Sequence, residues 1–159
     1  MPYMEQDSLY RQYIAWADSG AGVIWYNAPN RRSIIPTYVC PSDNNSPKTI
    51  ANEDQGFHAN YVLCAGSTSF NPTAARGTDL NGTFYAFSKS KLTDVTDGTS
   101  NTLFGSEILV SPDVTGHDTR GRVWNNADQG GNLFSTMNVP NTTTQDRLQY
   151  CQVIPGAPC

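Results

Sequence analysis

Residues 91–107 read KLTDVTDGTSNTLFGSE, and this stretch decides how the middle of the chain folds. The Asp97-Gly98 pair tolerates a reversal of the backbone, and the hydroxyl and amide side chains after it can bond the free amides and carbonyls of a turn. An apolar run follows directly. The pattern therefore predicts a polar hinge that leads into a core strand within residues 102–110.

The same stretch carries side-chain oxygens of the kind that hard cations prefer. They belong to Asp94, Asp97, Asn101 and Glu107. Their spacing matches neither the EF-hand loop nor another calcium motif, and Asp-Gly and Ser-Asn pairs are ordinary turn chemistry. The hinge is therefore predicted first as a turn, with Ca²⁺ as its candidate ligand and no other cofactor expected.

Composition indicates one α+β domain over residues 1–159. A chain of this length with 38% hydrophobic residues can bury a core. Charged residues make up only 15%, and the other polar residues are mainly Ser, Thr, Asn, Gln and Gly. This balance favours loops, turns and short strands over long solvent-facing helices.

Net charge and hydropathy exclude several classes of partner. A formal charge of −4 offers no attraction to phosphates, so nucleic acid is not expected as a partner. No apolar run approaches the roughly 20 residues that cross a bilayer, and the amino end lacks the pattern of a signal peptide. Because the chain opens within a helical pattern and ends on a cysteine, we expect it to be part of a longer precursor.

One amphipathic helix is predicted over residues 7–18. Leu9, Tyr13 and Trp16 recur there at helical spacing, either of the first two residues can cap the start, and Ser19-Gly20 can end it. Short β-prone runs alternate with long polar loops along the rest of the chain. The predicted strands lie within residues 34–40, 60–64, 83–87, 102–110 and 123–124, with residues 125–149 as irregular surface. We therefore expect a small antiparallel sheet beside the helix.

Four cysteines are widely spaced: Cys40, Cys64, Cys151 and Cys159. Without a Cys-x-x-Cys pair and with only two histidines, zinc is disfavoured. An even number of cysteines in a polar chain indicates disulfides and an oxidising compartment. Of the three pairings, Cys40 with Cys64 and Cys151 with Cys159 is favoured, and four reduced thiols are the alternative.

Catalytic motifs do not emerge from the sequence. His58 and His117 have no neighbouring nucleophile motif, and Gly130-Gly131 lacks the lysine of a phosphate loop. No spacing singles out a catalytic pair among the carboxylates. These are Asp43, Glu53, Asp94, Asp97, Glu107 and Asp128. We therefore expect no enzymatic activity.

Three Asn-x-Ser/Thr triplets begin at Asn44, Asn81 and Asn141 on predicted loops. They are candidate glycan acceptors, although such triplets also arise by chance in an Asn- and Thr-rich chain, and bacteria usually leave them bare.

Four groups of residues, taken in order, carry a resemblance. They are Pro2-Tyr3-Met4-Glu5-Gln6 with Leu9-Tyr10, Tyr38-Val39-Cys40-Pro41-Ser42-Asp43, Asn60-Tyr61-Val62 with Ala65-Gly66, and Asp94 through Thr102 with Gly105 and Glu107. Together they resemble a large bacterial family of pilin-like proteins of unknown function, also catalogued as a tenth bacterial solute-binding family. The resemblance covers about two thirds of the chain; the family's prepilin cleavage site, long hydrophobic helix and carboxy-terminal motif do not occur in it.

The resemblance implies a pilin-like head, in which the helix over residues 7–18 follows a stalk helix and touches the strand after Asn101. It also implies export, assembly with copies of itself at the cell surface, and membrane attachment only through that stalk helix. Calcium sites in the related pseudopilins make Asp94 and Asp97 stronger candidate ligands.

The sequence therefore predicts a non-catalytic subunit of an extracellular filament. An extracellular glycan- or solute-binding module is the alternative, with Trp25, Tyr26 and Trp124 as stacking platforms. A secreted hydrolase is a third hypothesis, which requires convergent carboxylates or a His-nucleophile pair in one cleft.

Overall fold

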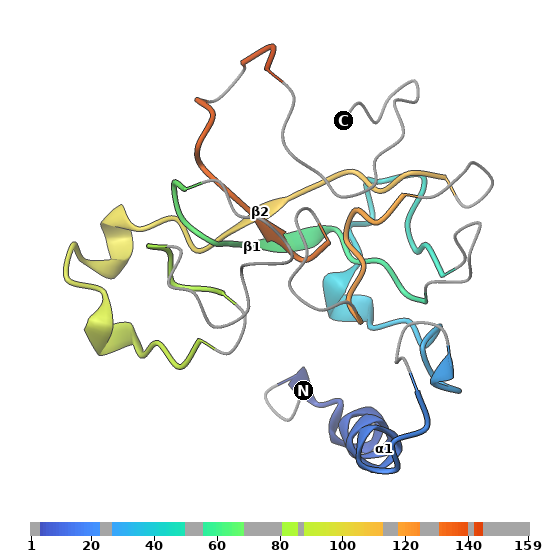
Figure 1. Cartoon of the computed structure of the whole chain (residues 1–159). Coiled ribbons are helices and arrows are strands. Elements are labelled where there is room, and N and C mark those ends of the chain that lie inside the picture. Colours follow the sequence, from blue (N-terminus) through green and yellow to red (C-terminus); the bar gives the residue numbers. More distant parts are fainter. Residues whose placement is uncertain are drawn as a thin grey trace.

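The computed structural model describes residues 4–22, 27–49, 56–68, 81–85, 88–112, 118–124, 131–139 and 142–144. In this part of the chain lie one α-helix, α1 (Asp7–Asp18), and three strands, β1 (Tyr61–Cys64), β2 (Gly105–Glu107) and β3 (Leu133–Phe134). Long loops and short 3₁₀ turns connect them (Figure 1). The fold is α+β and rich in loops, as predicted.

The three strands form a mixed sheet in the order β2-β1-β3. β1 and β2 are antiparallel, with Tyr61 opposite Glu107 and Leu63 opposite Gly105. β3 runs parallel to β1, so the expected antiparallel sheet is correct for one pair of strands and wrong for the other. β3 lies within the segment predicted to be irregular, because a strand of two residues leaves no periodicity to detect.

The helix has the bounds that its apolar spacing predicts, and Ser19 follows it as the carboxyl cap. Its buried residue, Tyr13, stacks on Trp124 with 3.6 Å between the ring centroids. Leu9 packs against a core cluster in the neighbouring loops, formed by Ile35, Phe57 and Ala59. Figure 1 shows α1 apart from all three strands. The expected packing of the helix on the sheet is therefore wrong, because the loops supply the apolar surface that covers its stripe.

Several predicted strands are turns. Within residues 34–40 the structure has the 3₁₀ turn η2 (Pro36–Tyr38), since Pro36 opens such a turn readily. Residues 83–85 and 123–124 are also not strands, and residues 86–87 lie outside the described part. The strand after the hinge does form, but all three residues of β2 are exposed, so it is not a core strand.

Cys40 and Cys64 carry free thiols, so the predicted bond between them is wrong. The amide of Cys40 donates to the side chain of Asn60, just before β1, whereas Cys64 is the last residue of β1. Four residues of strand separate these points, roughly 13 Å at about 3.3 Å per residue. A disulfide joins Cα atoms less than about 7 Å apart. Cys151 and Cys159 lie outside the described residues.

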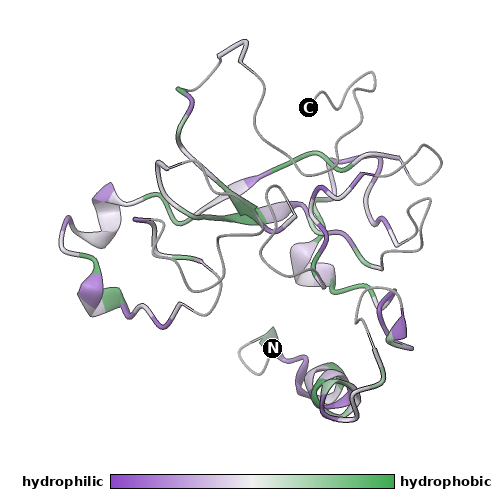
Figure 2. Cartoon of the chain, in the orientation of Figure 1, coloured by the Kyte–Doolittle hydropathy of each residue, from purple (hydrophilic) through white to green (hydrophobic). Residues whose placement is uncertain are grey.

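Within the described ranges, no helix has the length and hydropathy needed to cross a bilayer. Figure 2 shows apolar residues at β3 and along α1, and polar residues on many of the turns. The apolar core is thus split between two small clusters, one beside α1 and one formed by Ala65 and Leu133.

Candidate functional site

Asn60, immediately before β1, joins its own segment to residues 38–43 and to Ile108. Its side-chain oxygen accepts from the amide of Cys40 (2.9 Å), and its side-chain nitrogen donates to Asp43 Oδ2 (2.6 Å) and to the carbonyl of Ile108 (3.0 Å). Its backbone amide donates to the carbonyl of Tyr38, and its carbonyl accepts from the amide of Ile108. Because Asn60 is fully buried and fully bonded, its role is structural.

Asp43 is the second member of this buried network. Its carboxylate accepts from the amide of Asn45 (3.0 Å), the side chain of Asn60 and the amide of Val110 (2.9 Å). Three hydrogen bonds offset the cost of burying the carboxylate. Asp43 and Asn60 come from two of the motifs that carry the family resemblance, and here both act as connectors of loops.

A second buried polar group surrounds His58. The Nδ1 atom of His58 lies 2.6 Å from the carbonyl of Arg120, so Nδ1 carries the proton and donates it. Among the described residues, the Nε2 atom has no hydrogen-bond partner. Burial first, and then the positive charge of Lys48, lowers the pKa of His58 from 6.5 to about 3. The ring is therefore neutral at physiological pH. The backbone of His58 forms isolated antiparallel bridges with Lys48 and Arg122.

Two further polar contacts lie in this buried region. Lys48 Nζ donates to Ser111 Oγ (2.5 Å), and the guanidinium of Arg120 binds both carboxylate oxygens of Asp118 (2.8 and 3.1 Å). The side chains of Lys48, Ser111, Asp118 and Arg120 are buried. A buried charge without a partner is costly, so these contacts fix the loops in one arrangement. None of these groups lines the pocket described next.

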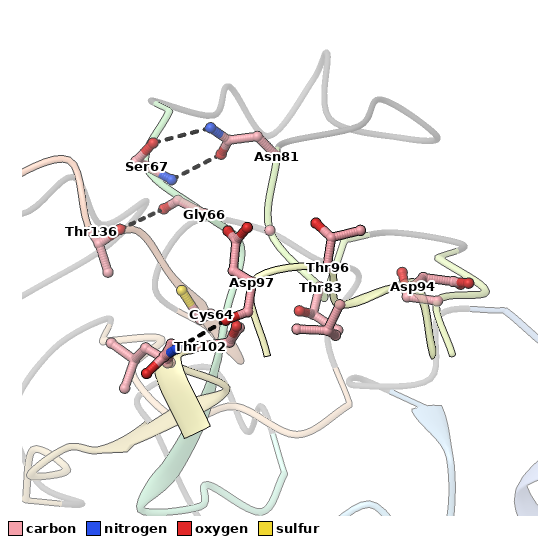
Figure 3. A pocket seen from close by; sticks show the side chains of 15 residues that line it. Cys64, Gly66, Ser67, Asn81, Thr83, Asp94, Thr96, Asp97, Thr102 and Thr136 are labelled. Atoms are coloured by element: carbon pink, nitrogen blue, oxygen red, sulfur yellow. Dashed lines mark hydrogen bonds between the residues drawn. The ribbon is translucent and has the colours of Figure 1, made fainter. Parts of the chain in front are cut away.

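An open polar pocket lies at the other end of β1 (Figure 3). It has a volume of about 410 Å³, within the range of small-molecule sites. Three segments and one further residue line it: the end of β1 and the turn after it, residues 81–83, the hinge between Ser90 and Leu103, and Thr136. Hydroxyl, amide and carboxylate groups make up most of the lining.

Some of these polar groups hold the walls together. Asn81 binds both the amide and the hydroxyl of Ser67 through its side chain (2.9 and 3.0 Å). Thr136 donates to the carbonyl of Gly66, and Thr102 donates to the carbonyl of Gly98. The walls are therefore fixed by bonds within the protein.

Other lining groups have no hydrogen-bond partner in the described part of the chain. They are the hydroxyls of Thr83, Ser90 and Thr96 and the carboxylate of Asp97. In Figure 3 the side chains of Thr83, Thr96 and Asp97 lie around this space, which water or a solute can fill. The thiol of Cys64 also lines the pocket, although its side chain is buried.

The four predicted calcium ligands are only partly brought together. Asp94, Asp97 and Asn101 line the pocket, but Glu107 lies on β2 and does not. One oxygen of Asp94 accepts from the amide of Lys91 (2.8 Å), and Figure 3 shows Asp94 away from Asp97. Across the described ranges, no three His, Cys, Asp or Glu side chains are grouped to hold a metal ion. The turn prediction for this stretch is correct: Gly98 has a φ of 84° and Asn101 Nδ2 donates to the carbonyl of Asp97.

The other predicted site residues have mixed outcomes. Trp124 is not an exposed stacking platform, since it stacks on Tyr13 and packs against the core cluster beside α1. Trp25, Tyr26 and Asn141 lie outside the described residues. Among the candidate glycan acceptors, Asn44 is exposed, and the side chain of Asn81 is engaged with Ser67. Sequence reasoning did not find the pocket, because its hydroxyl residues come from segments far apart in the chain.

One face of the sheet is open and mainly apolar, and it also carries exposed Glu107, which lies opposite Tyr61. Tyr61 and Leu63 alternate with buried neighbours along β1 and are 43% and 42% exposed. Leu103 and Leu109, which flank β2, are 54% and 50% exposed. Gly105 lies opposite Leu63 and leaves this apolar face flat. We call Tyr61, Leu63, Leu103 and Leu109 the open sheet face.

A family model described as a protein of unknown function (DUF1559) matches residues 1–154. Comparison with curated proteins and with solved structures gave no match. The matched family is consistent with the second catalogue name given by the sequence resemblance. This chain belongs to the DUF1559 family.

Proposed function

We propose that this chain is the non-catalytic, exported head of a pilin-like subunit that assembles with copies of itself. The open sheet face is the observation that carries this proposal. Four large apolar side chains gather there, each about half exposed. Grouped apolar side chains of this kind mark protein contact sites, whereas a single exposed one does not.

The position of β2 supports a second copy as the occupant of this face. β2 is an edge strand, and no strand in the described part of the chain pairs with its outer side. An open edge beside an apolar face suits a partner that brings its own strand. Two copies related by a twofold axis each supply such a strand.

The remaining polar residues support a role without catalysis. The buried carboxylates Asp43 and Asp118 and the buried His58 are engaged within the protein. Asp94 and Asp97 are the carboxylates in the pocket, and no histidine is among the described residues that line it. These arrangements support the proposal of a role in recognition.

Electron microscopy and sedimentation velocity test the assembly. Wild-type protein is expected to form dimers or longer particles, and Leu63→Lys is expected to abolish them, because it places a charge in the buried contact. Leu92→Lys is the matched control, since Leu92 is 72% exposed and does not belong to this face. A monomeric wild type, or equal assembly by Leu63→Lys, contradicts the proposal.

A further inference from the structure

The polar pocket beside Cys64 meets the open sheet face at Leu103, and the polar groups of its lining select a class of ligand. Thr83, Thr96 and Asp97 come from two segments, yet all three line one cavity. Figure 3 shows the side chains of Thr83, Thr96 and Asp97 around the pocket. Such convergence of hydrogen-bonding groups without internal partners is what a ligand site requires.

The pocket is formed before any ligand binds. Segment 81–83 lies directly on the backbone after β1, since a Cβ atom at Gly82 would stand 2.2 Å from the carbonyl carbon of Ala65. The bonds from Asn81 to Ser67 then hold this wall, and the hinge is held by its own turn bonds. A ligand would therefore meet fixed groups and lose little affinity to the ordering of loops.

The chemistry of the lining determines what fits. Threonine and serine hydroxyls both donate and accept, and a carboxylate accepts two donors. Together these groups match the hydroxyls of a polyol. Asp94 and Asp97 repel anions, and the apolar side chains of Val95 and Leu103 offer contact to carbon-bound hydrogens. The volume of about 410 Å³ suits a molecule the size of one sugar ring.

We propose that this pocket binds a single hydroxyl-rich ring that is uncharged or carries an amine, in the manner of a monosaccharide. Asp97 accepts hydrogen bonds from the ring hydroxyls or the ammonium group. Thr83 and Thr96 exchange hydrogen bonds with neighbouring hydroxyls. Leu103 is the one residue named for both the pocket and the open sheet face, and the two proposals are tested by different variants, so either can fail without the other.

Titration followed by amide NMR tests the site, with glucose, glucosamine, glucuronate and Ca²⁺ as separate probes. Glucose and glucosamine are expected to shift the amides of residues 81–83 and 94–97 with affinities on the order of 1 mM. Glucosamine is expected to bind more tightly than glucose, and glucuronate not to bind. The titration is repeated on monomeric Leu63→Lys, so that assembly does not affect the result.

Variants then assign the contacts. Asp97→Asn is expected to weaken glucosamine binding about tenfold, because hydrogen bonds to a charged group are the strong ones. Asp18→Asn removes the same charge from exposed α1 and is expected to leave binding unchanged. Thr83→Val is expected to weaken glucose binding, with exposed Thr37→Val as its control.

Four results would overturn the proposal. They are no shift with glucose or glucosamine, shifts from Ca²⁺ alone, binding of glucuronate as tight as that of glucosamine, and binding unchanged in both Asp97→Asn and Thr83→Val.

Discussion

The two ends of β1 use polar residues in opposite ways. At the amino end, Asn60 and Asp43 have almost every hydrogen-bonding atom engaged with buried backbone. At the carboxyl end, Thr83 and Asp97 line an open pocket, and their side chains have no hydrogen-bond partners among the described residues. Both ends contain residues from the motifs that define the family resemblance.

This difference shows how one short sheet can both stabilise a loop-rich fold and bear a site. Buried polar groups must be bonded, and their bonds are directional, so they fix the loops that meet there. Exposed polar groups are hydrated and lose little when they lack a protein partner. A motif residue therefore does not reveal by its type whether it holds the fold or meets a ligand.

The largest effect is expected from Asn60→Ala. The substitution leaves the amide of Cys40, the carboxylate of Asp43 and the carbonyl of Ile108 each without one buried partner. With a cost of roughly 1–3 kcal/mol for each unsatisfied group, the free energy of unfolding is expected to fall by about 3 kcal/mol or more. Urea denaturation followed by circular dichroism measures the loss.

Asn101→Ala is the matched control, because Asn101 is exposed and its side chain makes a single bond to the hinge. It is expected to cost less than about 1 kcal/mol. If the two variants were equally stable, the contrast between the two ends of β1 would not hold.

The next effect is a dependence of stability on pH through His58. Its pKa is about 3 in the folded protein and 6.5 for the unperturbed group, so the unfolded chain binds more protons between these values. The contribution of His58 to the free energy of unfolding is therefore fully present above about pH 6.5 and decreases as the pH falls below that value. The decrease from this one group is at most ~1.4 kcal/mol per pH unit.

Urea midpoints of wild type and His58→Asn between pH 7 and pH 4 check this expectation. The asparagine amide can donate to the carbonyl of Arg120 in place of Nδ1, and it does not titrate. The variant should be less stable at pH 7 and should show a shallower loss on acidification. Parallel curves for the two proteins would show that His58 does not titrate as described.

How well the sequence predicts each part of this structure depends on how far apart in the chain the interacting residues lie. The helix over residues 7–18 and the turn at Asp97-Gly98 were correct, since both rest on contacts between residues a few positions apart. The strand at 60–64 was correct in place, but its parallel partner, Leu133–Phe134, was not predicted. Pairing at that distance in sequence depends on loops that leave no local pattern.

The same limit applies to the sites. Asp94, Asp97 and Asn101 were identified as a group, and they do line one pocket, whereas Glu107 does not. The walls contributed by Asn81 and Thr136 could not be inferred, because isolated Asn and Thr residues in polar loops resemble their neighbours. The predicted disulfide between Cys40 and Cys64 was wrong for a related reason: Cys40 contacts Asn60 just before β1, whereas Cys64 is the last residue of β1.

A smaller effect is expected where the wall of the pocket meets β1. Gly82→Ala forces a Cβ atom against the backbone of residues 65 and 66, so the wall must move. Overpacking of this kind costs about 1–3 kcal/mol. Gly20→Ala meets no atom within 4 Å and tests only the cost of a φ of 66°. In thermal unfolding, Gly82→Ala should have a lower melting temperature than Gly20→Ala. The opposite order would mean that the wall of the pocket is loosely packed.

The smallest effect is expected from Thr96→Val in the pocket. The valine keeps the branched shape of threonine and removes a hydroxyl that has no partner in the described chain. Because that hydroxyl makes no hydrogen bond to the described part of the protein, its removal should change the free energy of unfolding by less than about 0.5 kcal/mol. Urea denaturation of Thr96→Val and Asn60→Ala under the same conditions measures the free energy of unfolding of both variants. A decrease of more than about 1 kcal/mol in the free energy of unfolding would contradict the difference between the two ends of β1. Thr96 would then stabilise the hinge in the way that Asn60 stabilises the loops at the other end.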